Sequence, residues 1–206
     1  MGQVISVIER PVTAKGLRKE AFPNEKRVRK YIFDEEYASL GLLSSLVPFS
    51  HRQATLLYPG CGSDILLPLI YLGHLFPQVE NVHCTFIDIQ PCLGLIKTIL
   101  DDVGVSFKEK KNSIDFYWKG KLIQVDFIRQ DVFSALPTLP EFDIYFERAF
   151  RIMKDSCAQY EPFIISKLKK NGVLISDSGF SQFPLERLPV DQRLGAYGEM
   201  IIGKKK

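Results

Sequence analysis

Two glycines near residue 60 mark the place in this sequence where a ligand could approach the backbone most closely. Gly60 and Gly62 stand between a short apolar run at 54–58 and a longer, mostly apolar segment that starts with Asp64, which predicts a turn from a strand into a helix. Glycine permits such a turn and places no Cβ in the way of a ligand, while the helix N-terminus offers N–H groups. The pattern therefore predicts a nucleotide-like ligand at this turn.

The spacing around the glycines narrows the choice of ligand. A dinucleotide fingerprint, G-x-G-x-x-G, needs a third glycine where this chain has Ile65, and no G-x-x-x-x-G-K-[ST] loop is present. The carboxylate of Asp64 would repel a pyrophosphate but would tolerate a sulfonium or an ammonium. These observations weaken the hypothesis that the protein is a nicotinamide-dependent reductase, and they give no support to ATP or GTP hydrolysis. A turn that uses its glycines for packing alone is the alternative.

Two acids follow the next strands of the chain. Asp88 ends an apolar run at 82–88, where a doubly wound sheet places a carboxylate for the hydroxyls of a ribose. Asp131 follows the run at 122–128 after two more residues. It could accept a hydrogen bond from an adenine amine while Val132 covers the ring. Either acid could instead cap the helix that follows it.

The sequence after the run at 142–146 supplies the candidates for catalysis. Glu147 could act as a base or orient a substrate, and Arg148 could hold an anionic group. The alternative is an ion pair between neighbouring side chains at a solvated helix start. We expect no metal site, because no His, Cys and Asp residues are grouped at zinc-ligand spacing.

The elements that must position these residues alternate along the chain. Short apolar runs that are typical of buried strands alternate with helical patterns, which indicates βαβ units. We expect a doubly wound, mostly parallel α/β sheet with helices on both faces and an N-terminal helical extension. The predicted strands are 54–58, 82–88, 122–128, 142–146 and 173–176, with an antiparallel strand at 114–118 joined through Lys119-Gly120-Lys121, and the main helices are 64–75, 91–103 and 156–168.

The N-terminal end of the chain is basic, whereas the rest of the chain is close to neutral. The first 30 residues carry a net charge of +5, which leaves −2 for the remaining 176. We assign residues 1–50 to a basic arm and helices that pack on the core, with Asn24 capping the first helix, and residues 51–206 to the main domain. A solvated arm is the preferred interpretation, although the M-G-x-x-x-S start fits an N-myristoylation template and would permit membrane contact. The lysines at 108–121 give no clear nucleic-acid signature.

Composition and cysteine spacing indicate in which cellular compartment the protein is expected. Hydrophobic residues make up 46% and charged residues 25% of the 206 residues, as in an ordinary soluble domain. The four cysteines have no C-x-x-C spacing, and the N-terminus lacks the layout of a secretory signal. We therefore expect free thiols and a cytoplasmic protein.

Taken together, these motifs resemble those of the class I S-adenosylmethionine-dependent methyltransferases over about residues 50–180. The resemblance implies a Rossmann-like methyltransferase fold, S-adenosylmethionine as cofactor and an unknown methyl acceptor. It assigns the cofactor to seven positions: Tyr58, Gly60, Gly62, Asp64, Asp88, Asp131 and Val132.

Three departures from the family leave a second interpretation open. Tyr58 and Pro59 stand where the family often has an acid, and Asp64 stands where it has a small residue. The chain also ends soon after the fifth strand, so we expect one last edge strand at 198–203 in place of a full hairpin. A non-catalytic relative that keeps the fold as a binding or scaffold module is therefore the alternative function.

Overall fold

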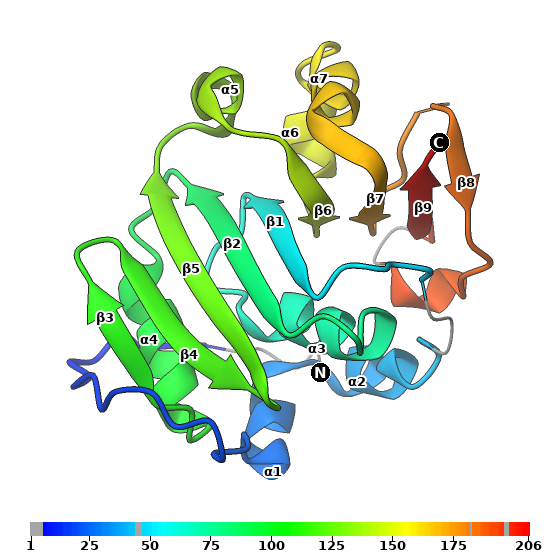
Figure 1. Ribbon diagram of the computed structural model, residues 1–206. Coiled ribbons are helices and arrows are strands. Elements are labelled where there is room, and N and C mark those ends of the chain that lie inside the picture. The colour runs from blue at the N-terminus through cyan, green and yellow to red at the C-terminus, as the bar shows by residue number, and fades with distance from the viewer. Residues whose placement is uncertain (1–5, 44–46, 182, 196–197) are drawn as a thin grey trace.

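The computed structural model describes residues 6–43, 47–181, 183–195 and 198–206 of the chain (Figure 1). The Met1-Gly2 start of the N-myristoylation template, and residues 44–46 of the region assigned to the N-terminal helices, lie outside the described residues. The strands are β1 (Gln53–Pro59), β2 (Asn81–Asp88), β3 (Phe107–Lys110), β4 (Ser113–Trp118), β5 (Lys121–Arg129), β6 (Phe142–Glu147), β7 (Leu168–Ser176), β8 (Leu185–Arg187) and β9 (Ile201–Lys205).

The described strands form one nine-stranded sheet in the order β3-β4-β5-β2-β1-β6-β7-β9-β8. Its core, β5-β2-β1-β6-β7, is parallel throughout, whereas the outer pairs β3-β4 and β9-β8 run antiparallel. Along the chain the core strands are the third, second, first, fourth and fifth parallel strands. The strand order therefore reverses between β1 and β6, which makes their carboxyl ends a topological switch point.

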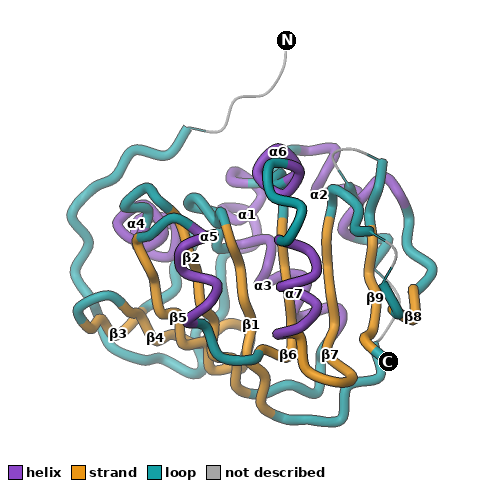
Figure 2. Tube along the Cα trace, turned by 90° about the horizontal axis from the view of Figure 1, so that it is seen from above, coloured by secondary structure: helices purple, strands orange, loops and turns teal. Residues whose placement is uncertain are grey.

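Helices cover both faces of this sheet, which confirms the predicted mixed α/β fold with a parallel core. One face carries α1 (Glu25–Val28), α2 (Asp34–Leu40), α3 (Leu66–Leu75) and α4 (Leu93–Asp102). The other carries α5 (Val132–Ala135) and α7 (Tyr160–Lys167), with α6 (Arg151–Asp155) beside them (Figures 1 and 2). Short 3₁₀ turns lie at 29–31, 136–138 and 192–194.

The molecule has two hydrophobic cores, one on each face of the sheet, because successive side chains of a strand point to opposite faces. In β1, Leu56 and Tyr58 pack toward α3 and α4, while Leu57 packs toward α5 and α7. All three are about 2% exposed, so the strand is apolar on both faces, as a central parallel strand must be. Val28, Ile32 and the end of α2 join the first of these cores, so the N-terminal helices pack against the sheet.

The predicted hairpin of β4 and β5 is present. Lys119 and Gly120, at its tip, both have positive φ, as a two-residue turn of the primed type requires. Lys121, just after the turn, is buried and its Nζ donates to the carbonyls of Phe76 (2.8 Å) and Pro77 (2.9 Å) at the end of α3. This lysine therefore connects the hairpin to the turn that follows α3 through the carbonyl groups of that turn.

The expectation of a single last edge strand at the C-terminus is wrong. β8 and β9 form an antiparallel hairpin, and β9 pairs with β7. The first strand of this hairpin was missed because its three residues, Leu185–Arg187, follow no period of two and lie close to two prolines. The helix predicted at 156–168 is shorter in the structure, where α7 begins only at Tyr160, and the preceding helix α6, which ends at Asp155, was not predicted.

The N-terminal arm, residues 6–24, has no helix or strand but lies against the domain. Gly16 N donates to the Phe107 carbonyl (3.0 Å), and Asn24 N donates to the Val103 carbonyl (2.8 Å). Asn24 also caps α1, as predicted, by accepting from Arg27 N (3.1 Å). The arm thus follows β3 and the end of α4.

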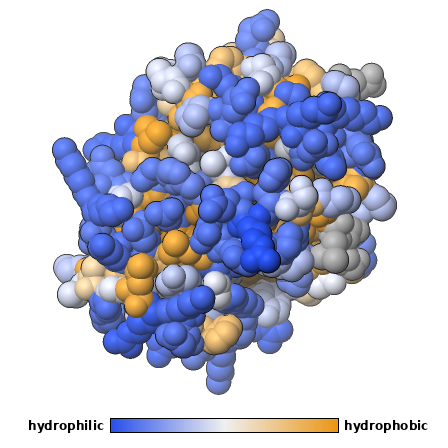
Figure 3. Space-filling model, in the orientation of Figure 1, coloured by the Kyte–Doolittle hydropathy of each residue, from blue (hydrophilic) through white to orange (hydrophobic). Residues whose placement is uncertain are grey.

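The surface shown in Figure 3 is mainly hydrophilic, with apolar side chains in separate small groups. Among the described residues, no helix has the length and apolar character that crossing a membrane requires.

Candidate functional site

A cavity of about 1010 Å³ opens where the strand order reverses, between the carboxyl ends of β1 and β6. Its walls come from the glycine turn after β1, from the residues after β6 and β7, from α2 and from the 3₁₀ turn at 192–194. This place is where doubly wound sheets bind their ligands, and the volume reaches the upper end of the ~300–1,000 Å³ range typical of ligand pockets. We refer to it as the rim cavity.

The glycine turn contributes one wall of the rim cavity. Tyr58 Oη donates to Asp64 Oδ2 (2.9 Å), and Asp64 Oδ1 accepts from the Leu67 backbone N–H (3.2 Å) in the first turn of α3. Asp64 therefore joins the end of β1 to the start of α3 while it lines the cavity. Both glycines of the turn have positive φ, +60° at Gly60 and +52° at Gly62, which favours glycine at each position.

The two glycines differ in their surroundings. A Cβ on Gly60 would lie 2.4 Å from the ring of Phe150, so that glycine is needed for packing against the chain's own side chain. A Cβ on Gly62 would meet nothing within 4 Å, and Gly62 lines the rim cavity. Gly60 is therefore needed for packing within the chain, which was the alternative interpretation of the turn. Gly62 leaves open space for a ligand.

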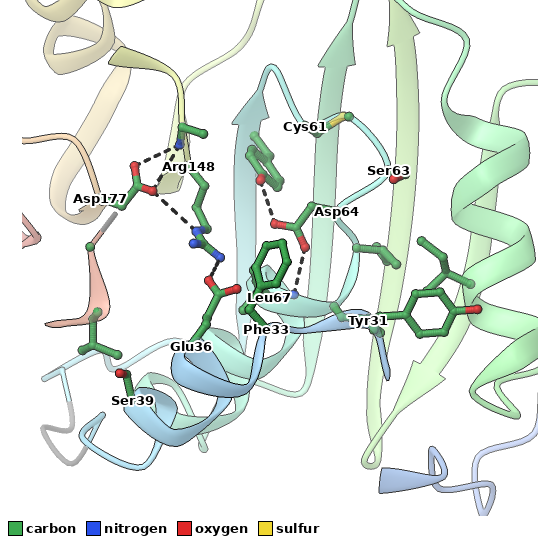
Figure 4. Close-up of a pocket in the computed structure, with 18 of the residues that line it drawn as sticks. Tyr31, Phe33, Glu36, Ser39, Cys61, Ser63, Asp64, Leu67, Arg148 and Asp177 are labelled. Carbon is green, nitrogen blue, oxygen red and sulfur yellow. Dashed lines mark hydrogen bonds and ion pairs between the residues drawn. The ribbon is translucent and has the colours of Figure 1, made fainter. Parts of the chain in front are cut away.

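Arg148 stands at the centre of the opposite wall. Its guanidinium forms ion pairs with Glu36 of α2 and, at 3.6 Å from Nε, with Asp177 after β7 (Figure 4). The Nε atom is buried and has no hydrogen-bond partner in the described part of the chain. Asp177 in turn accepts from the Ala149 N–H with both oxygens, at 3.0 and 3.2 Å. We refer to Arg148, Glu36, Asp177 and Asp64 as the cavity cluster.

The cavity cluster contains three carboxylates for one guanidinium. Burial raises the pKa of the Glu36, Asp64 and Asp177 carboxyls, and Arg148 opposes that rise. Burial would lower the pKa of Arg148, but the surrounding carboxylates outweigh it and raise that pKa. Arg148 thus stays charged, and the excess of carboxylates favours a ligand that carries positive charge together with an anionic group for Arg148.

The two aspartates predicted to hold an adenosine lie outside the wall of the rim cavity, Asp88 at the end of β2 and Asp131 two residues after the neighbouring strand β5. Asp88 accepts from Gly62 N and from Gln90 N, both at 2.8 Å. Asp131 caps α5 by accepting from the backbone N–H and the hydroxyl of Ser134, both at 2.9 Å. Gln130 N donates to the Asp88 carbonyl (3.0 Å), so the chain brings the two acids to one stretch of the rim. The side chain of Val132 is buried in the core that also contains residues of α7.

The structure separates the two predicted catalytic residues. Arg148 lines the rim cavity, whereas Glu147 is fully buried and binds Lys154 (2.8 Å) on the other side of β6. Successive residues of a strand point to opposite faces, which is why neighbours in the sequence reach different surroundings. The alternative of a mutual ion pair between them is also absent, because Arg148 pairs with Glu36.

Sequence reasoning missed the contribution of α2. Glu36, Phe33 and Ser39 line the rim cavity, yet an acidic first turn is an ordinary feature of a solvated helix. Asp177, which follows β7, lines the same cavity. Only the packing of α2 over the rim shows that these acids share one guanidinium.

Comparisons with known proteins give likenesses of structure only. No family model matches the chain, and no curated protein matches it. A hypothetical protein of Thermus thermophilus is 15% identical over 100% of this chain and 99% of its own, with a TM-score of 0.48. A putative class I S-adenosylmethionine-dependent methyltransferase of Listeria monocytogenes is 14% identical over 91% and 70%, with a TM-score of 0.48.

A further solved structure is a methyltransferase of Thiobacillus denitrificans in complex with S-adenosyl-L-homocysteine. It is 18% identical over 70% of this chain and 48% of its own, with a TM-score of 0.42. Overlaps at these TM-scores are too loose to assign a function, so the function must be inferred from this chain's own strand order and side chains.

Proposed function

We propose that the protein is an S-adenosylmethionine-dependent methyltransferase, with the amino-acid end of the cofactor in the rim cavity. The observation that carries the proposal is the cavity cluster at the topological switch point, three carboxylates around one guanidinium. S-adenosylmethionine carries an ammonium, a sulfonium and one carboxylate, which matches this surplus of negative charge. The motif resemblance around Gly60, Asp88 and Asp131 supports the same ligand.

The residues present fit the parts of the cofactor. Arg148, whose buried Nε has no hydrogen-bond partner among the described residues, would bind the carboxylate, and Asp64 would bind the ammonium. The open space at Gly62 would let the ligand lie against the backbone. Asp88 accepts one N–H on each oxygen, which leaves a lone pair on each for the hydroxyls of the ribose.

The chain's own residues can align an acceptor and receive its proton. The bound cofactor would supply a methyl group on a sulfonium, and the reaction needs little beyond alignment of the attacking atom. The Glu36 and Asp177 carboxylates line the cavity and have a raised pKa, so either is a candidate to take a proton from the acceptor. Glu147 is not proposed as the base, because its carboxylate does not reach the cavity.

A non-catalytic binding protein remains the second candidate. The observation in its favour is that Arg148 is already paired by the chain's own Glu36 and Asp177, while Phe150 packs on Gly60. A ligand that binds here must therefore displace or share these contacts. Binding without transfer of a methyl group would favour this candidate.

Calorimetric titration with S-adenosylhomocysteine, and separately with NADH, tests the proposal. We expect saturable binding of S-adenosylhomocysteine that weakens at least tenfold in Asp88→Ala and in Arg148→Met. Arg52→Met is the matched control, since Arg52 is 78% exposed and pairs with Glu80 away from the cavity. Uptake of NADH alone, or equal affinity in all variants, would overturn the proposal. Transfer of a radioactive methyl group to fractions of a cell extract then separates the enzyme from the non-catalytic candidate.

A further inference from the structure

A second group of polar side chains lies behind the rim cavity, on the other side of the ends of β6 and β7. It consists of Glu147, Lys154, Ser176 and Ser178, with the hydroxyls of Tyr145 and Tyr160. Each of these residues is buried, and we refer to them as the rim cluster. Members of the two clusters alternate along the chain: Glu147 precedes Arg148, and Ser176 and Ser178 flank Asp177.

The hydrogen bonds of the rim cluster converge on Glu147. Its Oε1 accepts from Lys154 Nζ (2.8 Å), Ser176 Oγ (2.5 Å) and Ser178 Oγ (2.7 Å), and its Oε2 accepts from Tyr145 Oη (2.5 Å). Tyr160 Oη lies 2.9 Å from Tyr145 Oη. These contacts leave the carboxylate fully hydrogen-bonded, as a buried charge requires.

Lys154 ties this carboxylate to the segment after β7. Its Nζ donates to Ser178 Oγ (3.1 Å) and to the Gly179 carbonyl (2.5 Å), and it lies 5.0 Å from the centre of the Phe180 ring. One side chain from α6 therefore holds the ends of β6 and β7 together. Because α6 follows β6 after only three residues, the same contacts also fix the short segment between them.

That short segment is strained. Ala149 has φ +51°, in the left-handed region that a residue with a Cβ occupies at a cost. Its N–H is held by Asp177 of the cavity cluster, and Arg148 and Phe150 lie on either side of it. Such a conformation persists only where surrounding contacts determine it, and the rim cluster supplies contacts on both sides of the strained residue.

We propose that Lys154 is a positioning residue for the rim cavity. By holding Glu147, Ser178 and the Gly179 carbonyl together, it keeps Arg148 and Asp177 at the separation that the ligand needs, although it lines no part of the cavity. The identity of that ligand rests on the proposed function, whereas the positioning itself depends only on the contacts described above.

Amide hydrogen exchange of Ala149 tests the positioning without any ligand. In Lys154→Met we expect this amide to exchange at least tenfold faster relative to amides of β1, because the Ala149–Asp177 bond is no longer held. Lys121→Met is the matched control: it also removes a buried lysine that binds carbonyl groups, but at the end of α3. The control should leave the Ala149 rate, relative to β1, within twofold of the wild type. A relative rate in Lys154→Met within twofold of the wild type overturns the inference.

Affinity for S-adenosylhomocysteine provides the second readout. We expect Lys154→Met to bind at least tenfold more weakly than the wild type and Lys121→Met to bind within twofold of it. If the wild type shows no binding, the proposed function fails while the exchange experiment still decides the positioning. If the wild type binds and Lys154→Met binds equally well, only the positioning role fails.

A charge-neutral double variant covers the case in which Lys154→Met does not fold. Glu147→Gln with Lys154→Met removes both buried charges and keeps side chains of similar shape. The same tenfold changes in exchange and in affinity are expected of it, because the bond to the Gly179 carbonyl is lost. Wild-type exchange and affinity in this folded double variant would overturn the inference.

Discussion

The carboxyl ends of β6 and β7 carry two polar clusters that differ in how completely they are satisfied. In the rim cluster, Glu147 is 0% exposed and both of its oxygens accept hydrogen bonds within the chain. In the cavity cluster, Arg148 keeps an Nε without a hydrogen bond among the described residues, and three carboxylates surround one cation. The carboxylate of the rim cluster is fully hydrogen-bonded within the chain, whereas the cavity cluster has an excess of negative charge beside open space.

The difference separates structural polar groups from groups that can bind a ligand. A buried charge that is fully hydrogen-bonded gains nothing from a ligand, and its removal disturbs the fold. A cluster with surplus charge beside a cavity can gain contacts, and pKa values raised by burial are common at such sites. Neighbours in the sequence, such as Glu147 and Arg148, can thus have different roles.

The largest effect is expected from truncation of the rim cluster. Glu147→Ala removes the carboxylate that accepts from buried Lys154 and from three buried hydroxyls and leaves only Glu161, at 3.6 Å, beside Lys154, so we expect a loss of about 3–5 kcal/mol of unfolding free energy. Glu36→Ala, in the cavity cluster, should change stability by only about 1 kcal/mol, because Arg148 keeps Asp177 nearby. Urea unfolding followed by circular dichroism measures both. Equal losses in the two variants would remove the distinction between the clusters.

The next largest effect on stability is expected at the glycine turn, where substitution of Gly60 should cost more than substitution of Gly62. Gly60→Ala combines a left-handed backbone with overlap on the Phe150 ring, so a loss of about 3 kcal/mol is expected. Gly62→Ala has open space around its Cβ and should lose only the backbone cost, about 1–2 kcal/mol. Thermal and urea unfolding of the pair checks this order. A Gly62→Ala loss as large as that of Gly60→Ala would contradict the packing described at Gly60.

The cavity cluster should also give the protein a specific pH dependence. Burial raises the folded-state pKa of Glu36, Asp64 and Asp177 above their unfolded values. The folded state then binds more protons than the unfolded one, so stability falls as pH rises from about 4 through the raised pKa values. Asp101 and Asp102 have lowered pKa values, and their opposite contribution lies below about pH 4.

Urea midpoints of the wild type and Asp64→Asn between pH 4.5 and 7.5 measure this dependence. We expect the wild-type midpoint to fall with rising pH and the variant to show a smaller fall, because one of the three raised carboxyls is gone. Parallel curves for the two proteins would show that Asp64 does not contribute.

The smallest effect is expected at a surface pair remote from both clusters. Lys97 and Glu109 lie 2.7 Å apart between α4 and β3, with side chains 22% and 35% exposed. Lys97→Ala should lower the unfolding free energy by at most about 1 kcal/mol, and 1 M NaCl should reduce that loss further. A loss similar to that of Glu147→Ala, unaffected by salt, would mean that exposure does not explain the difference between the clusters.

Patterns in the sequence predicted the parallel core because each central strand is a short apolar run bounded by turn residues. β1, β2 and β6 were placed within one or two residues of their observed ends, and the β4–β5 turn followed from Gly120. β8 could not be predicted, because three residues with mixed polarity carry no strand period.

The candidate site was harder to predict for a physical reason. A strand that is apolar on both faces has no hydrophobic alternation, so the sequence does not say which of Glu147 and Arg148 faces the cavity. Glu36 reaches Arg148 only because α2 packs over the rim, which depends on contacts far apart in the chain. The positions of the glycines and of Asp88 could be predicted, because a local turn and the end of a strand determine them.

A crystal structure of the protein soaked with S-adenosylhomocysteine tests the proposed binding site without relying on variants. We expect density for the amino-acid end between Arg148 and Asp64, with the ribose hydroxyls at Asp88. An empty rim cavity at saturating ligand, or a ligand bound elsewhere with the Arg148–Glu36 pair intact, would contradict it.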